Sequence, residues 1–318
     1  MRRFAYRNTT TVAEAVLLLK GGHAAVLAGG TDIINLLRMG ALTSPPETLV
    51  NIKNIPGMDF IREDANGLNI GATAKLSDIA SSEIIKSKYS ALARAAESVG
   101  SPPIREMGTI AGNLCQHVQC WYFRRSFLTG NFFDCLRKGG SQCYAVAGDN
   151  RYHAILGAKQ CFAVCPSDTA VALVALDSEI ITNKRSIPIA GFFQVQGNVL
   201  DEDEIIIEIR VPAPKPDTKQ VFIKFALRPT IDFAVASVAA VITTELGKVS
   251  DARIVLGAVA PVPYRANGAE NALKGNAVSE WIAEAAAAAA VNKAVPLSNN
   301  KYKVQIIRTL VKRAILES

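Results

Sequence analysis

The residues best suited to chemistry are six cysteines, which all lie within 51 consecutive positions of a 318-residue chain. They are Cys115, Cys120, Cys135, Cys143, Cys161 and Cys165. The first residues lack the long apolar centre of an export signal, and disulfides are disfavoured in proteins that stay in a reducing compartment. Buried structural cysteines would be scattered through a core, so this clustering favours metal ligation.

The spacing of the cysteines indicates which kind of metal site they could form. Successive cysteines are 5, 15, 8, 18 and 4 positions apart, without the C-x2-C pairs of a zinc ribbon. Four thiolates from separate loops can hold a cubane iron–sulfur cluster. Arg124, Arg125, Arg137 and Lys138 lie nearby and could offset its negative charge. A zinc site, six free thiols in a core, and nucleic-acid binding by the basic and aromatic residues 119–143 stay open as alternatives.

Two glycine turns could bind an anionic group. LAGGTD at 27–32 stands between an expected strand and helix, and GTIAGN at 108–113 is a second turn of this kind. Glycines let the backbone bend sharply and let a ligand approach its N–H groups, which favour phosphate. The turns could therefore hold a pyrophosphate between them, although neither has the G-x-G-x-x-G pattern of a Rossmann site.

Regular elements must position these motifs. The hydrophobic pattern predicts helices at 12–20, 33–40, 75–85, 89–100, 279–295 and 299–318. It predicts strands at 23–28, 48–52, 68–74, 205–212, 221–227, 233–245 and 253–260, and a helix followed by a strand over 166–180. The proline-rich residues 212–217 are the best candidate for a domain boundary.

The bulk composition limits the class of protein. The length predicts two domains or one large one, and 49% hydrophobic residues are ample for a core. No run of 18 apolar residues occurs, so we expect no membrane span and a cytoplasmic location, unless a partner subunit carries the protein elsewhere. The net charge of +7 is spread along the chain and is weak evidence for nucleic acid.

Several motifs, in this order, resemble a known family. They are VLAGGTDI at 26–33, TIAGNLCQ at 109–116, PSDTAVALVALD at 166–177 and LGAVAPVPYRANGAE at 256–270. Together they resemble the medium, FAD-binding subunit of the molybdenum hydroxylases, the group of xanthine dehydrogenase and carbon monoxide dehydrogenase. The resemblance covers essentially the whole chain.

The resemblance implies an FAD site. The residues that it assigns to the pyrophosphate are Val26, Leu27, Ala28, Gly29, Gly30, Thr31, Asp32 and Ile33, with Thr109, Ala111, Gly112 and Asn113 as the second loop. It places Asp168 at the ribityl or flavin side and Lys224 near the flavin, with Val99 and Trp121 as further contacts. On the residues alone, Asp168 is also a plausible first residue of a helix, and Lys224 could lie on a sheet surface.

The same resemblance implies a [4Fe–4S] cluster. A long insert with cysteines separates GN from PSD, as in the β subunit of 4-hydroxybenzoyl-CoA reductase and the flavin subunit of a periplasmic aldehyde oxidoreductase. The ligands that it implies are Cys120, Cys135, Cys143 and Cys161. Cys165 competes with Cys161 by its spacing, and we favour Cys161.

The implied fold class is α+β. Residues 1–213 would form a two-subdomain FAD-binding domain of the vanillyl-alcohol oxidase and cresol methylhydroxylase type, divided near residue 53, with the iron–sulfur insert at about 115–165. Residues 219–318 would form a C-terminal α+β domain.

The implied function is an oxidoreductase component without catalytic residues of its own. As an electron-transfer flavoprotein subunit, it would pass electrons through FAD and the [4Fe–4S] cluster. Its partners would be a molybdopterin-binding large subunit, a [2Fe–2S] small subunit and possible ferredoxin or other electron carriers. The alternative is a zinc-stabilised interaction or nucleic-acid-binding module without flavin. The substrate and the direction of electron flow stay open.

Overall fold

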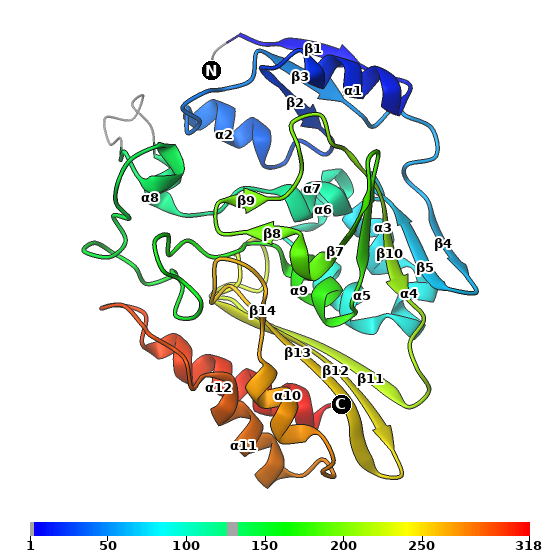
Figure 1. The fold of residues 1–318 in the computed structure, drawn as a ribbon, viewed down its shortest axis with the longest axis vertical. Coiled ribbons are helices and arrows are strands. Elements are labelled where there is room, and N and C mark those ends of the chain that lie inside the picture. Colours follow the sequence, from blue (N-terminus) through cyan, green and yellow to red (C-terminus); the bar gives the residue numbers. More distant parts are fainter. Residues whose placement is uncertain (1–2, 126–132) are drawn as a thin grey trace.

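The computed structural model describes residues 3–125 and 133–318 (Figure 1). Its described residues form three larger sheets, each with its own helices, stacked along the longest axis in the order of the sequence, and one small two-stranded hairpin. The mixture of helices and mainly antiparallel sheets confirms the expected α+β fold. No helix among the described residues has the length and apolar character needed to cross a membrane.

The N-terminal sheet is parallel and has the strand order β1-β3-β2. Its elements are β1 (Ala5–Asn8), α1 (Val12–Lys20), β2 (Ala24–Leu27), α2 (Ile33–Met39) and β3 (Thr48–Asn51). Helix α1 begins where the Thr11 hydroxyl accepts the backbone N–H of Glu14. Helix α2 begins directly after the first glycine turn, so the turn stands at the carboxyl end of β2.

The middle sheet is antiparallel and has the order β4-β5-β10-β6-β7. Its strands are β4 (Ile61–Asp64), β5 (Gly67–Gly71), β6 (Glu179–Thr182), β7 (Ser186–Pro188) and β10 (Ile206–Pro212). The accompanying helices are α3 (Leu76–Ser81), α4 (Glu83–Lys88), α5 (Ser90–Glu97), α6 (Pro102–Met107), α7 (Ile110–Cys115) and α9 (Asp168–Ala175). The single helix predicted over 75–85 is two helices, because Ser82 takes an extended conformation between them.

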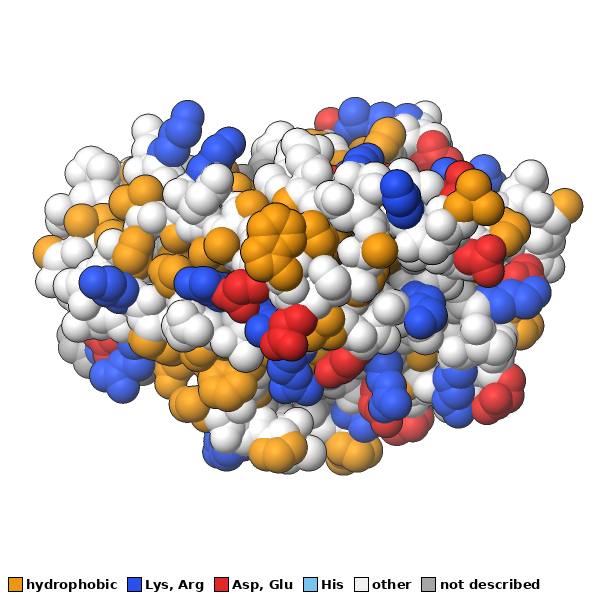
Figure 2. All heavy atoms as spheres, turned by 90° about the horizontal axis from the view of Figure 1, so that it is seen from below, with side chains coloured by type: hydrophobic (Ala, Val, Ile, Leu, Met, Phe, Trp, Pro, Cys, Tyr) orange, Lys and Arg blue, Asp and Glu red, His pale blue; other side chains and the backbone are white. Residues whose placement is uncertain are grey.

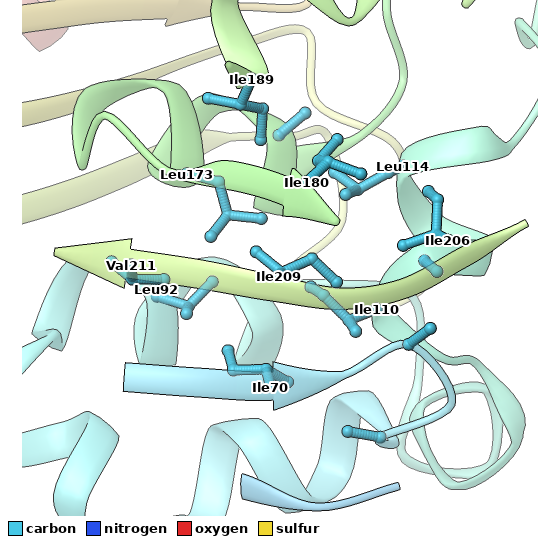
Figure 3. Close-up of a cluster of buried hydrophobic side chains, with 14 of the residues drawn as sticks. Ile70, Leu92, Ile110, Leu114, Leu173, Ile180, Ile189, Ile206, Ile209 and Val211 are labelled. Carbon is cyan, nitrogen blue, oxygen red and sulfur yellow. The ribbon is translucent and has the colours of Figure 1, made fainter. Parts of the chain in front are cut away.

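The main core lies between this sheet and its helices. Figure 3 shows Ile70, Ile180 and Ile209 of neighbouring strands in one cluster with Leu92, Leu114 and Leu173 of the helices. All eight residues of α9 are buried, because α9 packs against α5 on one side and against strands of the next sheet on the other. The N-terminus of α9 is therefore held firmly between the two sheets.

The C-terminal sheet is antiparallel and has the order β11-β12-β13-β14. Its elements are β11 (Thr218–Phe225), β12 (Ala236–Glu245), β13 (Lys248–Gly257), β14 (Tyr264–Arg265), α10 (Asn267–Leu273), α11 (Glu280–Ala290) and α12 (Tyr302–Leu316). Four alanines of α11 are buried at helical spacing and let it pack closely on α10 and α12. Figure 2 views the molecule from below in Figure 1 and shows basic, acidic and hydrophobic side chains interspersed rather than one continuous basic patch.

The cysteine segment has little regular structure. It contains α8 (Trp121–Arg124) and a 3₁₀ helix at Leu136–Lys138, and the small hairpin β8 (Phe193–Gln194) and β9 (Gly197–Asn198) lies beside it in Figure 1. The C-terminal part of the chain fixes this segment. Asn300 Nδ2 and Lys303 Nζ donate hydrogen bonds to the His153 carbonyl at 3.1 and 3.2 Å.

Candidate cofactor site

The two glycine turns touch each other through their backbones. A Cβ atom on Gly29 would lie 2.1 Å from the carbonyl oxygen of Met107 and 2.9 Å from the Cα of Gly108. Gly30 has a φ of +73°, which side-chain-bearing residues rarely adopt. The fold itself therefore requires glycine at positions 29 and 30, and the contact at Gly29 brings the two turns together, as the sequence suggested.

The second turn is tied to the start of α9. The Thr109 hydroxyl accepts the Gly112 N–H at 3.2 Å and begins α7. The Asn113 side-chain oxygen accepts hydrogen bonds from the hydroxyls of Ser167 and Thr169, both at 2.6 Å. Asn113 thus joins the GTIAGN motif to the PSD motif through hydrogen bonds, so each motif helps to position the other.

Residues of these turns line two adjoining cavities. A cavity of about 480 Å³ is lined by the residues Val26, Ala28, Gly29, Gly30, Thr31, Asp32, Ile33, Thr109, Ala111 and Gly112, among others. A cavity of about 190 Å³ shares Thr31, Asp32, Thr109 and Gly112 with it and adds Val99, Asn113, Asp168 and Lys224. Leu27 differs from the other assigned residues, because its side chain is buried in a cluster with Leu37 and Leu49.

Lys224 and Asp168 form a buried ion pair at the smaller cavity. Lys224 Nζ lies 2.7 Å from Asp168 Oδ2, and the side chains are 9% and 6% exposed. The ammonium also donates to the Ser98 carbonyl at 2.8 Å. Burial raises the pKa of Asp168, and the neighbouring Lys224 opposes that rise. Asp168 is the first residue of α9, and both side chains line the cavity. Lys224 is buried and does not lie on an open sheet surface.

A third cavity, of about 530 Å³, continues from the second and shares Asp168 and Phe233 with it. Its walls include Trp121, Tyr152 and His153, and the Trp121 ring meets the other two edge-on at centroid distances of 5.9 and 5.2 Å. Aromatic walls of this kind suit a planar ring. Cys120 also lines this cavity, so one of the predicted metal ligands borders it.

Several lining residues were not predicted. Gln116 lines the first two cavities, and it could have been found because it ends the motif TIAGNLCQ. Asp232 and Phe233 line the second and third cavities from the connection between β11 and β12. No local pattern marks that connection, because only the folding of the C-terminal sheet brings it there.

Arg124 has a different partner from the one expected. Its Nη2 lies 2.5 Å from Asp32 Oδ1, and its Nε donates to the Val118 carbonyl at 2.9 Å. The other Asp32 oxygen accepts the His117 N–H at 2.8 Å. Arg124 therefore neutralises a residue of the glycine turn, and it fastens the cysteine segment to that turn.

Three of the four predicted metal ligands lie at one small buried cluster. Cys135 and Cys161 pack there with Leu36, Val118 and Phe123, and the half-buried Cys120 packs against them. Cys143 directly follows Gln142, which forms a β-bridge with Cys135. Cys115 and Cys165 instead belong to the main core. In the parts of the chain that the structure describes, no three His, Cys, Asp or Glu side chains form a group that could hold a metal ion.

Polar groups surround these sulfurs. The Arg137 Nε donates to the Cys161 sulfur at 3.4 Å, and the Cys120 sulfur lies 3.3 Å from His153 Nε2. Burial raises the pKa of Cys120 to about 12, so this thiol is protonated when no metal is bound. Burial also raises the pKa of Cys135, against the backbone N–H groups of Arg137 and Lys138.

Comparison with known proteins identifies the class. Residues 2–214 match the FAD binding domain in molybdopterin dehydrogenase, and residues 222–318 match the CO dehydrogenase flavoprotein C-terminal domain. A fold with this pair of domains and with paired glycine turns defines an FAD-binding oxidoreductase subunit. The chain belongs to the molybdenum hydroxylase family, as one of its FAD-binding medium subunits. The family expected from the sequence motifs is thus confirmed.

Relatives match over nearly their full length. The aldehyde oxidoreductase FAD-binding subunit PaoB of Escherichia coli K12 is 31% identical over 332 residues, covering 100% of this chain and 99% of PaoB. The carbon monoxide dehydrogenase medium chain of Hydrogenophaga pseudoflava is 29% identical, covering 98% of this chain and 96% of that protein.

A solved carbon monoxide dehydrogenase structure from Hydrogenophaga pseudoflava has a TM-score of 0.77 at 29% identity, covering 99% of this chain and 96% of that one. None of these similarities supports a zinc-stabilised or nucleic-acid-binding module.

Proposed function

We propose that the chain passes electrons between FAD and a [4Fe–4S] cluster held by its own cysteines. One observation carries this proposal. A series of adjoining cavities leads from the paired glycine turns, past Lys224 and Asp168, to a wall that includes Cys120. A flavin can take up two electrons and release them singly, which suits a position beside a one-electron centre.

The cavities fit the parts of FAD by their chemistry. Backbone N–H groups at the glycine turns suit the pyrophosphate, and Gly29, Gly30 and Gly112 line this cavity. The aromatic walls around Trp121 suit the flavin ring. Lys224 would supply positive charge at the junction, with its orientation fixed by Asp168 and Ser98.

The cysteine cluster supports a ligand set of Cys120, Cys135, Cys143 and Cys161. Three of these side chains pack together, whereas Cys165 lies in the main core. Thiols must lose their protons to bind a metal, so assembly would release protons and draw the sulfurs into a closed set. Arg137 and Lys138 would offset the charge of the four thiolates. Arg124 would not take this role, because Asp32 already neutralises its charge.

The partners follow from the relatives. PaoB is named a subunit, and the carbon monoxide dehydrogenase relatives are named medium chains. We infer that this chain assembles with a molybdopterin-binding large subunit and a [2Fe–2S] small subunit. A ferredoxin or another carrier could exchange electrons with the cluster.

The test is anaerobic purification of the assembled complex, followed by analysis of flavin, iron and sulfide. We expect one FAD and one cluster in this chain, beyond the iron of the small subunit. Cys135→Ser should lose this cluster and retain FAD, whereas the matched substitution Cys165→Ser should retain both. Loss of the cluster in Cys165→Ser but not in Cys161→Ser would refute the ligand set. FAD without additional iron in the unmodified protein would refute the cluster itself.

A further inference from the structure

Arg137 joins the cysteine cluster to a hairpin of the FAD-binding domain. Its half-buried side chain donates from Nε to the Cys161 sulfur at 3.4 Å, and its Nη2 donates to the Val195 carbonyl. Val195 lies between β8 and β9, in the hairpin whose Asn198 lines the cavity of about 480 Å³. The guanidinium is thus held at both ends, which fixes its distance from the sulfur.

The backbone beside Arg137 connects it to a second proposed ligand. Cys135 stands directly before the 3₁₀ helix Leu136–Lys138, and its carbonyl oxygen accepts the Lys138 N–H at 2.7 Å. This short helical turn therefore places Arg137 two residues after one proposed ligand, while the Arg137 side chain donates to another.

We propose that Arg137 is a positioning residue that sets the reduction potential of the [4Fe–4S] cluster. This inference rests on the proposed function. Hydrogen bonds and positive charge at cluster sulfurs stabilise the reduced form, which carries one more negative charge, and so raise the potential. Arg137 forms no covalent bond and transfers no proton in this role, and the single electron is exchanged with the FAD of the same chain.

The rival explanation is that Arg137 only fastens the hairpin. These roles differ in what they predict for a substitution. A fastening residue would change stability and FAD retention but not the potential of an intact cluster. A residue that acts on sulfur would change that potential while the flavin potential stays the same.

The experiment is a redox titration of the complex, with the reduced cluster followed by electron paramagnetic resonance and the flavin by absorbance. Arg137→Leu should shift the cluster midpoint to a lower potential and leave the flavin midpoint in place. Arg137→Lys should shift it less, because it keeps the charge but loses the fixed fork of donors. The control Arg151→Leu removes an exposed arginine of the same segment, paired with Asp149, and should change neither midpoint.

An unchanged cluster midpoint in Arg137→Leu at full iron content would overturn the inference, as would an equal shift in Arg151→Leu. If Arg137→Leu does not retain iron, Arg137→Gln decides, because it keeps an N–H donor without the charge. A lowered midpoint then supports the inference, and an unchanged one overturns it. Absence of the cluster from the unmodified protein would refute the proposed function before any variant is compared.

Discussion

Arg124 and Asp32 form an ion pair between residues 92 positions apart, with Nη2 and Oδ1 at 2.5 Å. The side chains are 9% and 18% exposed, so water screens the pair only weakly. Asp32 belongs to the first glycine turn and Arg124 to the cysteine segment. The contact therefore connects the candidate flavin site to the candidate metal site.

Removal of Arg124 should weaken both sites. Arg124→Met leaves the Asp32 carboxylate without its cation, and loss of one member of a buried pair costs about 3–5 kcal/mol. We expect a loss of unfolding free energy of this order in urea, together with lower FAD content after purification. Arg125→Met removes the exposed neighbouring arginine and is the control. Equal effects of the two substitutions would contradict the role of the ion pair.

The Lys224–Asp168 pair should show strong coupling in a double-mutant cycle. Lys224→Met alone buries an unpaired carboxylate and should cost roughly 3–5 kcal/mol in the flavin-free protein. Lys224→Met combined with Asp168→Asn should cost less than the sum of the single substitutions, because the second change removes the unpaired charge. Urea unfolding of the four proteins measures this coupling, and simple additivity would show that the pair does not act as a unit.

Gly29→Ala should damage the fold at the glycine turns. The new Cβ would meet the Met107 carbonyl oxygen at 2.1 Å, and a backbone atom cannot yield cheaply. Overpacking of this kind costs roughly 1–3 kcal/mol, and FAD content should fall with it. Gly21→Ala is the matched control, since its Cβ would lie 3.6 Å from the Leu18 carbonyl oxygen at a φ of −68°. Thermal unfolding should leave this control near the original midpoint.

The lowered pKa of Glu204 leads us to expect a loss of stability in acid. Hydrogen bonds from Arg185 lower the pKa of this buried carboxyl to about 2, with further donors from Asp201 and Thr182. Because the pKa of Glu204 in the folded protein lies below the ordinary glutamate value of 4.5, its contribution to stability is complete above that ordinary value and is lost as the pH falls through about 2. We expect this carboxyl to contribute about 2 kcal/mol to the free energy of unfolding, after allowance for the half-exposed Arg185.

Unfolding free energies measured between about pH 5 and pH 2 should therefore fall less steeply in Glu204→Gln than in the unmodified protein. Glu202→Gln changes an exposed neighbour and should keep the original slope. A parallel slope in Glu204→Gln would mean that this carboxyl contributes nothing to acid unfolding.

The sequence by itself determined the local elements and the family. The helix predicted at 12–20 is α1, because Thr11 caps it and apolar residues recur at helical spacing. The glycine turns and the PSD motif carry the family resemblance, because their backbone conformations and their contacts through Gly29 and Asn113 leave few other residues possible.

Only the tertiary structure decided which charged and polar groups meet. Periodicity and capping report the conformation of neighbouring residues and which face is buried, but they do not name a distant partner. The pairing of Asp32 with Arg124, of Asp168 with Lys224 and of Cys161 with Arg137 spans 92, 56 and 24 positions. Each pairing joins side chains that only the folding of the intervening chain brings together, so it became visible only in the tertiary structure.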